Sequence, residues 1–164
     1  MISRLRVLAV SVVAIAALVA PAGAAAAAPE TASGTMTTTS ATFNGVRFAG
    51  GNTILNLTST VLYTGTFSGT SVVRGTLTFH PNGTATFHDI ETFTGTVNGV
   101  PGTVTFNLNG SSDPELNVRG TAVVVGATGE LFGMHGVLRQ SAVVIDTAAG
   151  PVGTYNGTIT LAGG

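Results

Sequence analysis

The stretch "GTATFHDIETFTGT", from Gly83 to Thr96, decides the fold class. Its residue types alternate with a period of two, which is the pattern of a β-strand that buries one face. Phe87 and Phe93 fall on one face, and Asp89 and Glu91 fall on the same face between them. The stretch therefore predicts a strand that directs two carboxyl groups to the side where its aromatic side chains pack.

The same alternation runs through most of the chain and predicts an all-β protein. Eight segments show it: residues 33–43, 55–67, 72–80, 84–97, 104–108, 116–125, 137–146 and 155–161. Short turns such as "HPNG", "NGVPG" and "AAGPVG" join them, and no segment has the 3.6-residue period of an amphipathic helix. Such a meander closes into a barrel or folds into a sandwich. We expect about eight antiparallel strands in a mostly up-and-down closed barrel, with room inside for side chains or one small ligand.

The first residues are typical of a cleavable secretory signal peptide. Arg4 and Arg6 precede an apolar run over residues 7–20, and the small-residue tail "GAAAAAPE" follows. Cleavage after Ala27 fits the small-x-small pattern and assigns residues 1–27 to the signal peptide. We expect a secreted bacterial protein with no membrane anchor after cleavage.

The remaining chain divides into a flexible N-terminus, residues 28–32, and a single barrel domain, residues 33–164. It carries four arginines against seven acidic residues and no cysteine. A surface without a basic patch argues against nucleic acid as a partner. The three histidines, His80, His88 and His135, are dispersed, so we expect no metal site and no cofactor. Oligomerisation is possible.

The faces of the strands also predict how neighbouring strands pair. A three-residue loop after His80 would pair Phe79 with Ala85 and set Gly75 beside Asp89. The same argument pairs Val73 with Glu91. For the preceding hairpin it pairs Phe67 with Val73 and Gly65 with Gly75, and for the following one it pairs Val97 with Val104.

These registers predict a hollow beside the acids. Glycines inside strands leave space for the close approach of a backbone or a ligand. We expect a pocket for a small molecule. Its predicted ligand-binding residues are Tyr63, Gly65, Phe67, Gly75, Phe87, Asp89 and Phe93. Glu91 is the candidate catalytic residue. A carboxyl in such a site has a raised pKa unless an arginine reaches it, and Arg119 and Arg139 are the candidates for that pairing.

Two alternatives to a functional acid remain open. A β-bulge near His88 and Asp89 would rotate one acid out to water. Alternatively, Glu91 lies inside as a structural ion pair with one arginine.

A glycine-rich turn carries a resemblance to a known group of proteins. The stretch "VVVGATGELFGMHG", Val123 to Gly136, together with the hairpin 82–87 and the segment "ETFTG", 91–95, resembles a bacterial family of unknown function. That family shares a calycin-type β-barrel with allene oxide cyclases and plant dirigent proteins. The resemblance implies an eight-stranded barrel with an apolar cavity, in which cyclases work by holding a flexible intermediate in one conformation. It places Glu91 at the family's strand acid and Glu130 in its "GEL" turn.

Three functions remain open from the sequence. The first is an exported barrel that binds a small apolar or amphipathic molecule. The second is a cyclase or isomerase in which Glu91 acts as an acid or stabilises charge. The third is a structural barrel whose interior is filled by its own side chains.

Overall fold

The computed structural model describes residues 27–146 and 150–161, and all regular structure in these ranges is β. The strands are β1 (Glu30–Ala49), β2 (Asn52–Gly65), β3 (Phe67–Phe79), β4 (Ala85–Val97), β5 (Val100–Ser112), β6 (Asn117–Gly129), β7 (His135–Asp146) and β8 (Gly150–Thr160). Apart from Ala27, the predicted signal peptide lies outside the described residues. Among the described residues, no helix is long and apolar enough to cross a membrane.

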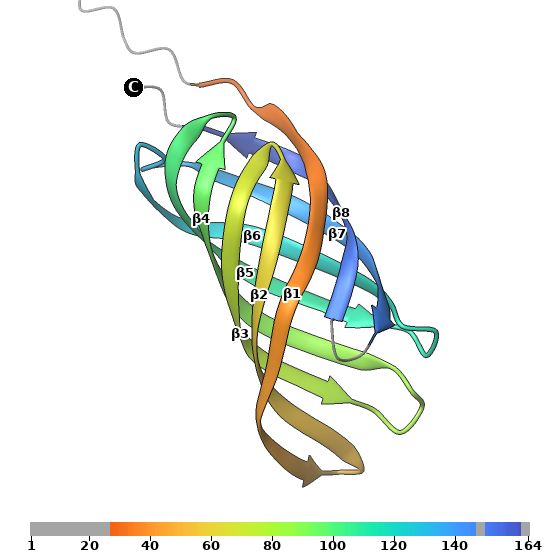
Figure 1. Ribbon diagram of the computed structural model, residues 1–164. Coiled ribbons are helices and arrows are strands. Elements are labelled where there is room, and N and C mark those ends of the chain that lie inside the picture. The colour runs from red at the N-terminus through yellow and green to blue at the C-terminus, as the bar shows by residue number, and fades with distance from the viewer. Residues whose placement is uncertain (1–26, 147–149, 162–164) are drawn as a thin grey trace, which may run out of the picture.

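The eight strands form a closed antiparallel barrel (Figure 1). Each strand pairs with the next along the chain, and β1 pairs with β8 to complete the ring. The predicted all-β, eight-stranded, up-and-down barrel is therefore confirmed. Closure removes free sheet edges, and the alternation in each strand separates an inner from an outer face.

The barrel begins earlier than the sequence suggested. Glu30 already pairs with Ile159 of β8, and Ala32 is fully buried. The Glu30 carboxylate also accepts a hydrogen bond from the side-chain amide of Asn98, at 2.7 Å. Residues 30–32 thus belong to the barrel rather than to a flexible N-terminus.

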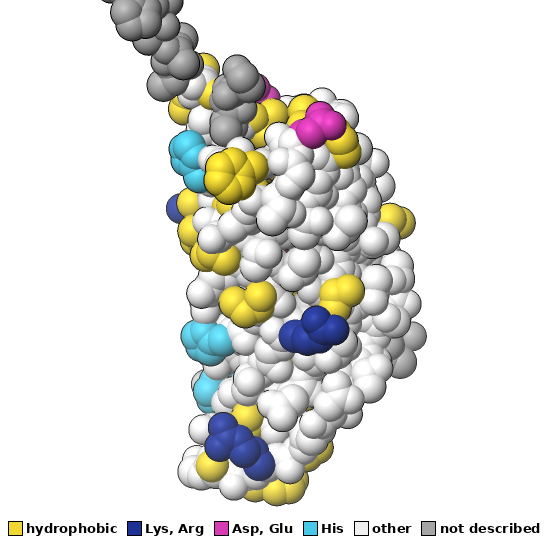
Figure 2. Space-filling view, turned by 90° about the vertical axis from the view of Figure 1, so that its left-hand side faces the viewer, with side chains coloured by type: hydrophobic (Ala, Val, Ile, Leu, Met, Phe, Trp, Pro, Cys, Tyr) yellow, Lys and Arg dark blue, Asp and Glu magenta, His cyan; other side chains and the backbone are white. Residues whose placement is uncertain are grey.

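The outward-facing positions of the strands are rich in threonine, and few charged side chains lie on the face drawn in Figure 2. Threonines meet across neighbouring strands, as in the 2.7 Å hydrogen bond between the hydroxyls of Thr35 and Thr64. Thr94 and Thr103 form a longer pair of the same kind, at 3.5 Å. β-Branched cross-strand pairs suit the solvated face of a sheet, which explains how so polar a sequence forms stable strands.

The β3–β4 register agrees with the prediction. Phe79 pairs with Ala85, and the ladder continues through Gly75 opposite Asp89 and Val73 opposite Glu91. The pairing of β4 with β3 is continuous from Ala85 to Val97, and so is its pairing with β5. A bulge that turns Asp89 or Glu91 outward is therefore excluded.

The predicted β2–β3 register is wrong. The chain reverses at Thr66, between β2 and β3, and Gly75 therefore pairs with Leu57. Gly65 pairs with Gly34 of β1. Gly65 has a φ of 100°, which favours glycine at this corner of the barrel. The error is an even number of residues, which leaves every side chain on its predicted face.

The predicted β4–β5 register is also wrong, and again the error is an even number of residues. Val97 pairs with Val100 rather than with Val104, and Glu91 faces Phe106. The two-residue loop consists of Asn98 and Gly99, with φ values of 50° and 83°. Two successive positive φ values are the mark of a type I′ turn, for which Asn-Gly is the preferred sequence.

One end of the barrel is filled by an aromatic core. Phe67 packs edge-on against Phe93 with ring centroids 5.2 Å apart, and it also contacts Tyr155. Leu131 and Met134, from the β6–β7 connection, are buried and close this end. The aromatic core thus fills only one end of the barrel's interior, and it does not extend to the opposite end.

Candidate functional site

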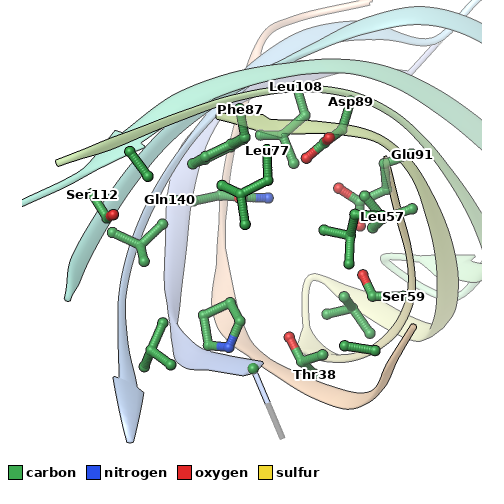
Figure 3. A pocket seen from close by; sticks show the side chains of 18 of the residues that line it. Thr38, Leu57, Ser59, Leu77, Phe87, Asp89, Glu91, Leu108, Ser112 and Gln140 are labelled. Carbon is green, nitrogen blue, oxygen red and sulfur yellow. The ribbon is translucent and has the colours of Figure 1, made fainter. Parts of the chain in front are cut away.

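The barrel contains a cavity of about 490 Å³ toward the end where β3–β4 and β5–β6 are connected (Figure 3). All eight strands contribute to its wall. The lining residues are Met36, Thr38, Ala41, Phe43, Leu55, Leu57, Ser59, Val61, Tyr63, Val73, Leu77, Phe79, Ala85, Phe87, Asp89, Glu91, Leu108, Ser112, Leu116, Val118, Gln140, Val144, Gly150 and Pro151. The volume lies in the range of about 300–1,000 Å³ that is typical of small-molecule sites.

A polar cluster borders the cavity on the side of the aromatic core. It consists of Tyr63 from β2, Asp89 and Glu91 from β4, and Gln140 from β7. Figure 3 labels the last three of these residues. The side chains of Asp89 and Glu91 are only 6% and 1% exposed. Because β4 alternates without interruption, the pleat that directs Phe87 and Phe93 inward also directs both carboxyl groups inward.

Glu91 makes one strong hydrogen bond and leaves one oxygen free. The Ser71 hydroxyl donates to Glu91 Oε1 at 2.5 Å, whereas Oε2 has no hydrogen-bond partner among the described residues. Burial raises the pKa of the Glu91 carboxyl, and the polar groups of Ser71, Tyr63 and Gln140 oppose that shift. Glu91 is thus a desolvated acid with unused acceptor capacity.

Asp89 is a second buried acid on the same face. Burial raises its pKa to about 6, and the negative charge of Glu91 adds to the shift. His88 and the backbone of Thr76 lower it by smaller amounts. Within the described part of the chain, Asp89 Oδ1 has no hydrogen-bond partner.

Tyr63 and Gln140 connect the two sides of the cluster. Gln140 Nε2 donates a hydrogen bond to the Tyr63 hydroxyl at 3.1 Å. Burial, together with the charge of Glu91, raises the pKa of Tyr63 well above its usual range. The phenol therefore stays protonated near neutral pH and keeps a proton to donate beside Glu91.

The two arginines expected to pair with the acids do not reach them. Arg119 and Arg139 are exposed and alternate with inward-facing neighbours on β6 and β7. The interpretation of Glu91 as a structural ion pair is therefore wrong. Its local stabilisation comes from neutral hydrogen-bonding groups instead.

The structure brings together only part of the predicted ligand-binding set. Tyr63, Phe87 and Asp89 line the cavity, as does the candidate catalytic residue Glu91. The predicted pocket positions of the others need correction. Phe67 and Phe93 belong to the aromatic core, Gly65 lies at the β2–β3 corner, and Gly75 lies directly against the backbone of β4.

Sequence reasoning missed Gln140 and the hydroxyls of Ser59 and Ser71. Gln140 is buried, and it shares its strand face with Leu138 and Ala142. A long polar side chain on an apolar face is the same signal that marked Asp89 and Glu91, so Gln140 could have been found. Serines are too common on both faces of these strands for their pattern to stand out.

The cavity's open end is bordered by apolar side chains. Beyond Thr38, β1 pairs with β2 alone and continues past the barrel as a long hairpin (Figure 1). Phe43 and Phe79 line the cavity there while remaining partly exposed. Phe48, near the tip of the hairpin, is 80% exposed. The cavity thus combines an acidic inner end with an apolar mouth.

Comparison with known proteins agrees with the resemblance in the glycine-rich turn. The model of a family described as a protein of unknown function (DUF3224) matches residues 32–149. The chain belongs to the DUF3224 family. A search of curated proteins finds no match.

Solved structures share the fold. A DUF3224 protein of unknown function from Shewanella oneidensis MR-1 is 18% identical, with a TM-score of 0.62 over 84% of this chain and 100% of that one. The pterocarpan synthase dirigent protein PsPTS1 is 12% identical, with a TM-score of 0.58 over 85% and 99% of the two chains. The pterocarpan synthase dirigent protein GePTS1 is also 12% identical, with a TM-score of 0.56 over 88% and 96%. At these identities the likeness concerns the barrel alone.

Proposed function

We propose that this DUF3224 barrel binds a small apolar or amphipathic molecule in its cavity. The observation that carries the proposal is a cavity of about 490 Å³ that has mostly apolar walls and two buried carboxyl groups at its inner end. Ligand sites in proteins are typically apolar hollows with a few polar groups that fix orientation. A structural barrel filled by its own side chains would lack such a space.

A cavity-filling variant tests the proposal. Ser59 is buried and its hydroxyl points into the cavity, so Ser59→Leu should reduce the available volume (Figure 3). Asn56→Leu is the matched control, because Asn56 is exposed on the outer face of the same strand. We expect a neutral, environment-sensitive dye to bind the parent protein and Asn56→Leu, and to bind Ser59→Leu at least about tenfold more weakly. Equal binding by all three proteins would place the dye outside the cavity.

Native mass spectrometry identifies what the cavity carries. The protein is purified from the culture medium of its own host and transferred without denaturation. An added mass that is present in the parent protein and absent from Ser59→Leu supports a ligand in the barrel. An added mass that survives this substitution contradicts the assignment of the ligand to the cavity.

A cyclase or isomerase activity is the second candidate. It is supported by two buried acids with raised pKa values that face the cavity, since such acids can transfer protons near neutral pH. The fold neighbours that are named pterocarpan synthases add a barrel precedent only. Loss of turnover in Glu91→Gln, with dye binding retained, would favour this function over simple binding.

Export is part of the proposal. The charged start, the apolar run and the small-residue tail before Ala28 support it. Amino-terminal sequencing of protein from the medium should begin at or near Ala28. A protein that retained Met1 would contradict the proposed export.

A further inference from the structure

Two carboxyl oxygens beside the cavity have no hydrogen-bond partner. Asp89 Oδ1 and Glu91 Oε2 are both buried, and no described residue donates to either of them. The two residues are separated by one position on β4, so their side chains leave the same face of the strand (Figure 3). Buried polar atoms are almost always hydrogen-bonded, so a pair of orphaned acceptors indicates a missing donor.

No cationic side chain of the described residues lies inside the cavity beside these acids. Among the described residues that line the cavity, none is arginine or histidine, and the whole chain lacks lysine. The titratable group that faces Glu91 from β2 is Tyr63, which stays neutral. His88 adjoins Asp89 in sequence but is exposed, and its ring hydrogen-bonds Asn109 on the outer face. Within the described part of the chain, no side chain offers these acids a counter-charge from inside the cavity, so a bound molecule is the source that we consider.

We infer that the ligand of this cavity is a cationic amphiphile, whose ammonium group binds Asp89 and Glu91 and whose apolar body lies along the cavity wall. This inference rests on the proposed function. An ammonium carries three donors and no acceptor, so one group can satisfy both orphaned oxygens. An alcohol offers a single donor, and a carboxylate would add a like charge to the cluster.

The rest of the cavity fits the apolar part of such a molecule. Leu57, Leu77 and Phe87 surround the space next to the acids (Figure 3). Farther along, Phe43 and Phe79 extend the apolar lining to the open end. A ligand with its amine at the acids and its chain toward the mouth would bury apolar surface along its whole length.

The test compares three probes with the same ten-carbon chain: decylamine, decanol and decanoate. The assay measures how well each probe displaces the neutral dye from the mature protein at pH 8. Every probe is used below its own critical micelle concentration. A charge-assisted hydrogen bond is worth more than a neutral one, so decylamine should bind about ten- to hundredfold more tightly than decanol. Decanoate should bind most weakly. Equal affinity for decylamine and decanol, or a preference for decanoate, would overturn the inference while leaving the proposed function intact.

Substitutions of the acids test the location of the amine. In the double variant Asp89→Asn, Glu91→Gln, the preference for decylamine should fall to within about threefold, while decanol affinity is retained. Glu130→Gln is the control, because Glu130 is an exposed acid in the β6–β7 connection that does not line the cavity. A preference that survives in the double variant would show that the amine binds elsewhere. If neither the dye nor any probe binds, the proposed function fails together with this inference.

Discussion

Gly75 lies directly opposite Asp89 in the β3–β4 ladder, and the absence of a side chain at Gly75 makes room for that carboxyl group. A Cβ at position 75 would lie 2.6 Å from the Asp89 Cα and would also meet the His88 carbonyl oxygen and Asp89 Oδ1. Two of these three atoms belong to the backbone, which cannot move aside without disturbing the ladder. Gly75 is therefore a close-contact position rather than an empty part of the cavity.

Gly75→Ala should consequently destabilise the barrel by roughly 1–3 kcal/mol, the usual cost of forcing extra atoms into a packed site. A larger residue such as leucine would worsen the clash instead of filling the cavity. Gly126→Ala is the matched control, since a Cβ there meets nothing within 4 Å. Urea unfolding measures both variants, and equal stabilities would contradict the close contact.

Tyr155 connects β8 to the corner between β2 and β3 through its hydroxyl. The backbone N–H of Phe67 donates to this hydroxyl at 2.9 Å, and the hydroxyl donates to the Thr64 carbonyl at 3.0 Å. Tyr155→Phe keeps the ring but leaves both backbone groups without their partner. We expect a loss of about 1–3 kcal/mol in the free energy of unfolding. Thr154→Ala, an exposed change at the neighbouring position, should cost much less, and a similar loss in the two variants would contradict a specific role for the hydroxyl.

The two wrong registers show how far alternation can determine this fold. Alternation assigned Phe87, Asp89, Glu91 and Phe93 to the inner face, because a buried face repeats every two residues. It does not fix the register, since a slip by an even number of residues preserves every face. The Asn98-Gly99 pair was the missing information: it forms the tight turn that sets the β4–β5 register.

The position of the cavity was beyond the reach of the sequence pattern. Phe67 and Phe87 have the same inward pattern, yet Phe67 lies in the aromatic core and Phe87 lines the cavity. The difference depends on which end of the barrel is filled by Leu131 and Met134. The packing of Leu131 and Met134 against the aromatic core joins residues that are distant in sequence, and the local alternation of residue types does not encode it.

The pKa of Asp89 predicts how stability depends on pH. It is about 6 in the folded protein, compared with about 3.9 for an unperturbed aspartate. Between these values the folded state binds more protons than the unfolded state, so the free energy of unfolding should fall as pH rises from about 4 to about 6. The size of this contribution is of order 1–3 kcal/mol.

Asp89→Asn should remove that contribution and raise stability at pH 8 relative to the parent protein. Asp113→Asn provides a contrast of opposite sign. Hydrogen bonds from Asn117 hold the pKa of Asp113 below its usual value, so the ionised carboxylate stabilises the fold at pH values above about 4. Asp113→Asn should therefore lower stability at pH 8. Urea unfolding from pH 4 to pH 8 measures both variants. A parent protein whose stability does not change over this interval would contradict the shifted pKa of Asp89.

The hydrogen bond from Ser71 to Glu91 gives the last prediction, because its strength depends on the charge of the acceptor. Hydrogen bonds to an ionised carboxylate are stronger than hydrogen bonds to a neutral one. Removing the Ser71 hydroxyl deletes one of the contacts that lower the pKa of Glu91, so that pKa should rise further. A further rise in the folded state takes away stability as pH increases. Ser71→Ala should therefore destabilise the barrel more at pH 8 than at pH 5, as measured by urea unfolding.

Two controls test whether the charge of Glu91 causes this difference. In a Glu91→Gln background the difference between the two pH values should vanish, since the acceptor no longer ionises. Ser59→Ala is the second control, because Ser59 is also a buried serine but, among the described residues, makes no hydrogen bond to Glu91. A loss from Ser71→Ala that is equal at both pH values would mean that Glu91 does not change its protonation state over this range and would contradict the prediction.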